Sequence, residues 1–185
     1  DSCIPKENRP VTYIPTAAVS GSRPKESIDD VAARIMELAE KHPSQKGVIH
    51  ATYNQAALLK FLLTSDRFIF HTRKTKSTVY AGFRETEKPV ILVASGLYEG
   101  IDLPQDAGRW QIITKVPFPS LGEPAIKYRM AKDKDWYGWQ ASKVMLQACG
   151  RICRGPDDFG ETYIIDNSFD RLYTKNPKMY PVWFK

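Results

Sequence analysis

The sequence contains no apolar run long enough to cross a membrane. Its longest apolar stretches, at 90–94 and 56–63, fall far short of the roughly 20 residues that span a bilayer as a helix. The opening segment is polar and includes Pro5 and Pro10, which excludes the apolar centre of a signal peptide there. These absences predict a soluble intracellular protein, cytoplasmic or, in a eukaryotic source, nuclear, with no membrane partner.

Cysteine is also scarce. Cys3, Cys149 and Cys153 form no CxxC pair and are too few for a disulfide scaffold or for a four-cysteine zinc or iron–sulfur site. We interpret them as reduced and mostly buried side chains, and we expect no metal site. Cys149 and Cys153 would touch if they shared a helix, so a shared metal ion stays open as an alternative to packing.

The composition is otherwise that of an ordinary globular protein, with more basic than acidic residues. The 185 residues, 42% hydrophobic and 26% charged, are enough to bury one core and fit a single domain spanning 1–185. The net charge of +6 favours an anionic partner. Many basic proteins bind no nucleic acid, so the charge is weak support when taken alone.

Short apolar stretches alternate with segments of helical period, which is typical of βα units around a mostly parallel sheet. The fold class is therefore α/β. We expect strands at 11–15, 48–51, 67–71, 90–95, 111–116 and 162–166. We expect helices at 27–42 with Ser27 as N-cap, at 54–63 with Asn54 as N-cap, at 75–88, from about 125, and from near 137 to 154.

The segment 147–154, Gln-Ala-Cys-Gly-Arg-Ile-Cys-Arg, carries the strongest chemical signal. If the last long helix continues through it at about 100° per residue, Gln147, Gly150, Arg151 and Arg154 share one face. Two guanidiniums and an amide on one small patch suit a polyphosphate, because the planar fork of arginine stays charged and bonds two oxygens at once. A solvated helix face with two ordinary arginines is the alternative.

A second signal lies in 95–103, Ser-Gly-Leu-Tyr-Glu-Gly-Ile-Asp-Leu, directly after the clearest apolar strand. Glu99 and Asp102 form a carboxylate pair on this glycine-rich loop, at the strand end where open α/β sheets bind ligands. Both carboxylates are equally compatible with an ordinary turn.

These two stretches carry a resemblance to a known family. The segment 95–103 resembles motif V, and 147–155 resembles motif VI, of the XPD/DinG helicases of superfamily 2, in the same order and at a similar separation. Further similarity lies in 51–54, which resembles motif IV, in 115–119, and in the two end segments 2–11 and 181–184. The chain thus resembles the C-terminal RecA-like domain, motor domain 2, of this family, whose fold is a three-layer α/β/α sandwich.

The resemblance implies a role for each matching residue. The chain would be the second motor domain of an ATP-dependent 5′–3′ DNA helicase, with Arg151 and Arg154 as arginine fingers beside Gln147 at the γ-phosphate. The residues implied at ATP are Glu99, Gly100, Asp102 and Gly150. The residues implied on the track of single-stranded DNA are Thr52, Tyr53 and Ser95. Arg73 and Lys74, in a basic run after a strand, are added as phosphate contacts, with a solvated turn as the alternative.

The sequence departs from a complete motor in one respect, because it contains no GxxxxGK[ST] phosphate loop. ATP and Mg²⁺ would therefore be bound mainly by the first motor domain, a partner of the same parent protein that is absent from this chain, and any iron–sulfur cluster would not lie in this chain. We expect the isolated domain to be inactive. A non-enzymatic nucleic-acid-binding module that keeps the RecA-like fold is the alternative function, and a nucleotide-binding regulator without a DNA role ranks behind it.

Overall fold

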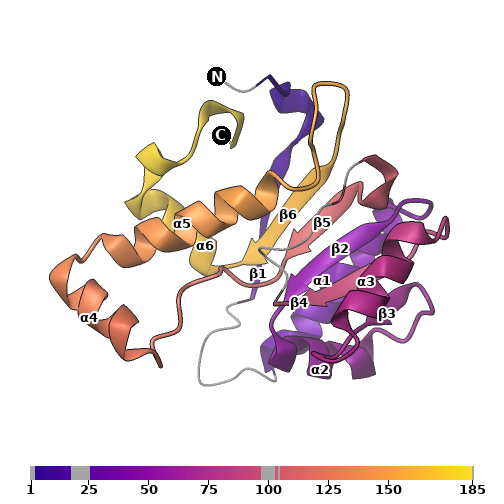
Figure 1. Ribbon diagram of the computed structural model, residues 1–185, viewed down its shortest axis with the longest axis horizontal. Coiled ribbons are helices and arrows are strands. Elements are labelled where there is room, and N and C mark those ends of the chain that lie inside the picture. Colours follow the sequence, from indigo (N-terminus) through magenta and orange to yellow (C-terminus); the bar gives the residue numbers. More distant parts are fainter. Residues whose placement is uncertain (1–2, 18–25, 97–102, 104, 185) are drawn as a thin grey trace.

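A single parallel sheet organises the chain (Figure 1). The computed structural model describes residues 3–17, 26–96, 103 and 105–184. The strands are β1 Val11–Ala17, β2 Gly47–Ala51, β3 Phe68–Phe70, β4 Ile91–Ser95, β5 Trp110–Ile113 and β6 Glu161–Asp166. Their order is β1-β6-β5-β2-β4-β3, and every pairing among these described strands is parallel. The expected α/β class with a mostly parallel sheet is confirmed.

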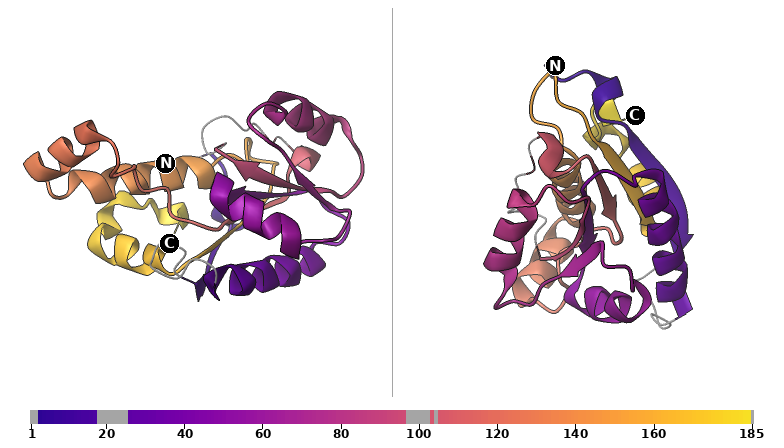
Figure 2. Two further views of the ribbon diagram at one scale, coloured as in Figure 1. Left: turned by 90° about the horizontal axis from the view of Figure 1, so that it is seen from below. Right: turned by 90° about the vertical axis from the view of Figure 1, so that its right-hand side faces the viewer.

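Helices cover both faces of the sheet, which gives three layers (Figure 2). They are α1 Glu26–Lys41, α2 Tyr53–Leu62, α3 Lys76–Glu85, α4 Pro124–Lys132, α5 Trp136–Cys149 and α6 Ser168–Lys175. Short 3-10 turns occur at Lys6–Asn8, Gln105–Ala107, Pro177–Met179 and Val182–Phe184. Neighbouring strand residues point to opposite faces: Ile49 packs in the core under α1 and α2, whereas Val48 packs with Phe83 of α3.

The central strands are apolar because both of their faces are covered. All five residues of β2 and all five of β4 are buried. A strand with one solvated face would alternate polar and apolar side chains, whereas a strand inside a three-layer sandwich does not. The continuous apolar run at 90–94 therefore belongs to an interior strand, β4, which lies between β2 and β3.

The cap of α2 differs from the expected one. Thr52, not Asn54, is the N-cap: its hydroxyl accepts from the backbone N–H of Gln55, and the Gln55 side chain accepts from the backbone N–H of Thr52. This reciprocal arrangement is a capping box. Ser27 is also not a cap, because α1 begins at Glu26.

The largest difference concerns α5, which ends at Cys149 and does not continue to Arg154. The N–H of Arg151 donates to the carbonyl of Ala148, a tighter turn than the helix has, and Gly150 contributes the weak helix propensity of glycine. Ile152, fully buried, then packs with Leu103 in the core on the α3 face. Burial of Ile152 draws the chain away from the helix axis, so the shared helix face expected for Gln147, Arg151 and Arg154 is wrong.

One helix was not expected from the sequence. The helix α6 follows β6 directly and buries Phe169 and Leu172 against α5. The two end segments of the chain also meet, since the guanidinium of Arg9 lies 4.1 Å from the ring centre of Trp183. In Figure 1 both termini accordingly lie at the same end of the molecule.

Candidate functional site

A group of polar side chains lies where β2, β3 and β4 end at their carboxyl termini. We name this group, Thr52, Tyr53, His71, Arg73, Ser95 and Gly96, the carboxyl-edge cluster. Parallel pairing sets Ala51 beside Ser95, so the residues that follow these strands start from the same edge of the sheet. Four of the five side chains predicted to contact DNA, those of Thr52, Tyr53, Arg73 and Ser95, belong to this cluster.

The ring of Tyr53 is the centre of the cluster. The Arg73 guanidinium lies 5.0 Å from its ring centre, and the His71 ring meets it edge-on at 6.2 Å. Gly96 packs beneath it with φ of +65°, and a Cβ atom there would lie 3.3 Å from Cε2 of Tyr53. Both the backbone conformation and the close approach therefore require glycine at Gly96.

Ser95 occupies the cluster differently from the expectation. Its side chain is fully buried, and its backbone N–H donates to Nε2 of His71 at 3.0 Å. Its hydroxyl has no hydrogen-bond partner within the described part of the chain. Lys74 is exposed in the turn after His71, and Lys76 donates to the carbonyl of Gly96 at 3.0 Å.

The segment 147–154, which we name the arginine segment, leaves the end of α5 as an irregular turn. Gln147 is exposed in the last turn of the helix, Gly150 is its C-cap, Arg151 is half-buried and Arg154 is exposed. The predicted catalytic residues thus remain close together along the chain, but through a turn and not along a helix face.

A buried polar network holds the arginine segment from the sheet side. The side-chain NH₂ of Gln111 donates to the carbonyl of Ala148, at the end of α5, and to the hydroxyl of Thr162. Its side-chain oxygen accepts from Nε2 of His50 at 3.0 Å. Burial lowers the pKa of His50 to about 4, opposed by the hydrogen bond to Gln111 and reinforced by the positive charge of Arg151. A neutral imidazole therefore lies in the field of the arginine.

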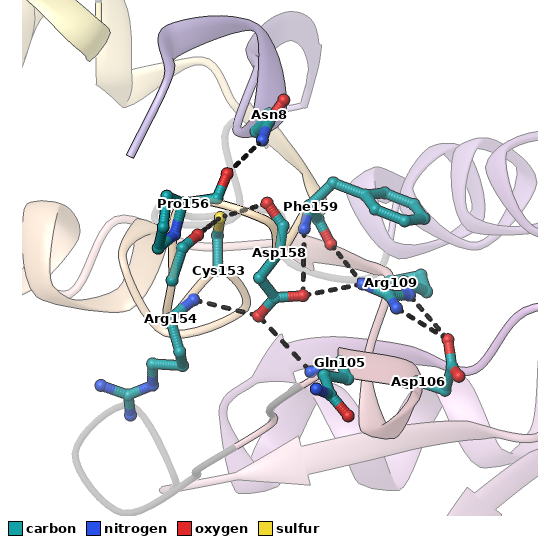
Figure 3. Close-up of polar contacts among 10 residues, drawn as sticks. Asn8, Gln105, Asp106, Arg109, Cys153, Arg154, Pro156, Asp158 and Phe159 are labelled. Atoms are coloured by element: carbon teal, nitrogen blue, oxygen red, sulfur yellow. Dashed lines mark hydrogen bonds and ion pairs between the residues drawn. The ribbon is translucent and has the colours of Figure 1, made fainter. Parts of the chain in front are cut away.

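Asp158 holds the same segment from the other side (Figure 3). Its buried carboxylate accepts from the backbone N–H of Arg154 at 3.0 Å and from the guanidinium of Arg109 at 2.8 Å. Neither Asp158 nor Gln111 belongs to the residues predicted from the sequence, and both make contacts with residues far away along the chain, Arg109 and Ala148.

The remaining predicted residues have two different outcomes. Glu99, Gly100 and Asp102 lie outside the described residues. Cys149 and Cys153 are both buried, and burial raises the pKa of each thiol, which supports packing. Within the described ranges, no group of three or more histidine, cysteine, aspartate or glutamate side chains is arranged to hold a metal ion.

Some aromatic residues near α4 and α5 pack against other rings, whereas others are exposed. Tyr137 stacks on Phe118 with ring centres 5.3 Å apart. Tyr128 and Trp139 are 64% and 45% exposed.

No helix in the described part of the chain is long and apolar enough to cross a membrane.

The chain is similar in sequence to a known family and to several known proteins. The family described as helicase C-terminal domain matches residues 31–184. The homologue of regulator of telomere elongation helicase 1 from Caenorhabditis elegans is 29% identical, over 47% of this chain and 10% of that protein, and the Bos taurus protein is 28% identical, over 47% and 8%. The chain thus matches about a tenth of the length of these curated relatives.

Solved structures show the same fold. The structure of S. tokodaii Xpd4 superimposes with a TM-score of 0.69 at 17% identity, covering 97% of this chain and 39% of that one. An apo XPD structure gives a TM-score of 0.71 at 17% identity, covering 92% of this chain and 39% of that one. The solved structures thus show the RecA-like fold, and the match of the family model over residues 31–184 shows that the chain belongs to the helicase C-terminal domain family.

Proposed function

We propose that this chain is the arginine-finger half of an ATP-dependent 5′–3′ DNA helicase. The observation that carries the proposal is the anchoring of the arginine segment on two sides. Gln111 holds the carbonyl of Ala148, and Asp158 holds the N–H of Arg154. Two guanidiniums on a stiff turn suit stabilisation of the charge that builds up on a transferring phosphoryl group, because fixed donors need no reorganisation during the reaction.

The nucleotide itself would be held mainly by the first motor domain. This sequence has no phosphate loop, so ATP and Mg²⁺ require that partner domain of the parent protein. Gln147, Gly150, Glu99, Gly100 and Asp102 would complete the site from this side. Closure of the two domains would bring Arg151 and Arg154 to the γ-phosphate, and hydrolysis would release them.

The carboxyl-edge cluster supports a track for single-stranded DNA. Arg73 and Lys74 are exposed cations at this edge, and Thr52 adds a hydroxyl. Backbone phosphates are bound by positive charge and hydroxyl groups, without reading the bases. Because Ser95 is buried, its part is to position His71 through its N–H, and contact with the phosphates falls to its neighbours.

The relatives' names include a helicase that regulates telomere elongation. They support DNA as the nucleic acid and, in a eukaryotic source, the nucleus as the location. The family resemblance supports the 5′–3′ direction of movement.

The finger assignment is tested in the full-length parent protein. Arg151→Ala and Arg154→Ala should each lower the kcat of ATP hydrolysis by about 100-fold or more, with single-strand affinity unchanged. Arg84→Ala, an exposed arginine on α3, is the matched control and should leave kcat unchanged. A normal kcat in both Arg151→Ala and Arg154→Ala would refute the finger assignment. A parent protein that binds DNA without hydrolysing ATP would favour the non-enzymatic nucleic-acid-binding module.

A further inference from the structure

The carboxylate of Asp158 is the most heavily engaged polar group beside the arginine segment (Figure 3). Oδ1 accepts from Nη1 of Arg109 at 2.8 Å and from the N–H of Phe159 at 3.0 Å. Oδ2 accepts from the N–H of Arg154 at 3.0 Å and from that of Gln105 at 3.4 Å. The side chain is only 7% exposed, so these donors replace the water that a buried carboxylate loses.

These contacts join two separate parts of the chain. Arg154 belongs to the arginine segment, whereas Gln105 begins the 3-10 turn Gln105–Ala107 and Arg109 directly precedes β5. Gln105 has a φ of +53°, a left-handed conformation that a residue with a side chain rarely adopts, and its N–H points at Asp158. A backbone held in this conformation indicates that the surrounding contacts fix Gln105 itself.

Arg109 is itself immobilised on the far side of the carboxylate. Its guanidinium also pairs with Asp106 at 2.8 Å, donates to the carbonyl of Phe159 at 3.0 Å and lies 3.9 Å from the Phe159 ring centre. The charge of Asp158 is thus directed to Arg109, whereas its contact with Arg154 is made to the backbone alone among the bonds drawn in Figure 3. The Arg154 guanidinium points away from the carboxylate in that view.

We propose that Asp158 is a positioning residue for Arg154: it fixes the backbone from which the finger leaves, and so sets where the guanidinium meets the phosphate. The proposal rests on the proposed function, in which Arg154 serves ATP hydrolysis. Misplacement of a reacting group by about 1 Å is enough to cost on the order of 100-fold in rate, so a fixed backbone N–H matters for turnover.

Asp158→Asn is the informative substitution. Each carboxylate oxygen meets two N–H donors, so an amide must turn its NH₂ group toward two of them and lose both bonds. In the full-length parent we expect kcat for ATP to fall about 10- to 100-fold, with KM for ATP and single-strand affinity within about twofold. Affinity for ADP with aluminium fluoride, a transition-state mimic, should fall, while affinity for ADP alone should not. Asp157→Asn, the exposed neighbour, is the matched control and should change none of these values.

A double variant separates positioning from general loop stability. If Asp158 acts through Arg154, adding Asp158→Asn to Arg154→Ala should cause no further loss of kcat, because the two changes remove one contribution. Multiplying losses would overturn the proposal, as would an unchanged kcat in folded Asp158→Asn. If the asparagine variant does not fold, Asp158→Glu carries the same tests, since it keeps the charge and shifts the carboxylate by one methylene. Unchanged kcat in Arg154→Ala would instead refute the finger assignment, whatever Asp158 does.

Discussion

Acidification should destabilise the chain through one buried histidine. His50 is 1% exposed in β2, and its pKa falls to about 4 from 6.5 because burial disfavours the charged ring. The folded-state pKa is the lower one, so the unfolded chain binds more protons below pH 6.5. The contribution of His50 to stability is complete above pH 6.5 and is lost as the pH falls toward 4.

The loss is large enough to measure. The fall in pKa from 6.5 to about 4 corresponds to about 3 kcal/mol of unfolding free energy across this window, and a domain typically has about 5–15 kcal/mol in total. Urea denaturation of the 185-residue chain, followed by tryptophan fluorescence, gives this free energy at each pH. His50→Gln, which has no ionisable ring, should show a decline smaller by about 3 kcal/mol between pH 6.5 and 4.

Other groups titrate in the same window, so the comparison between variants carries the test. Parallel curves for the wild type and His50→Gln would refute the assignment of a neutral His50 in the core.

Two further predictions concern the elements that support the site. Gly47→Ala should cost about 3 kcal/mol of unfolding free energy, because its Cβ would lie 2.2 Å from Cε2 of the buried Trp110. Gly82→Ala has nothing within 4 Å of its added Cβ, so it should stabilise α3 by up to about 1 kcal/mol in the same urea assay. Thr52→Ala should cost about 1 kcal/mol through loss of the α2 cap, whereas Thr52→Ser keeps the capping hydroxyl and should not. Equal stability of the two alanine variants at 47 and 82, or of the two variants at 52, would contradict these contacts.

The sheet was predictable because its signals are local. Each of the six strands follows from a short apolar or β-branched run, and β2 and β4 are buried along their whole length because both of their faces are covered. The parallel arrangement follows from the alternation of strands and helices, since parallel neighbours need a crossover. The ends of the elements were less predictable, as the shift of the α2 cap from Asn54 to Thr52 demonstrates.

The candidate site was predicted from sequence motifs, and the geometry of the arginine segment differs from the expected helix face. Arg151 and Arg154 were identified through their motif, whereas the path between them depends on contacts that are distant in sequence. Gln111 reaches Ala148 across 37 residues, and Arg109 reaches Asp158 across 49. Neither contact leaves a periodic pattern in the sequence, so the sequence could not indicate that the helix ends before Arg151.

The corrected path changes how the two arginines relate to their surroundings. On one side the neighbouring titratable group is His50, which burial keeps neutral, so it offers Arg151 no opposing charge. On the other side the nearby carboxylate, Asp158, is paired with Arg109 and meets Arg154 through the backbone. Polar contacts therefore hold the arginine segment at two backbone positions, the carbonyl of Ala148 and the N–H of Arg154.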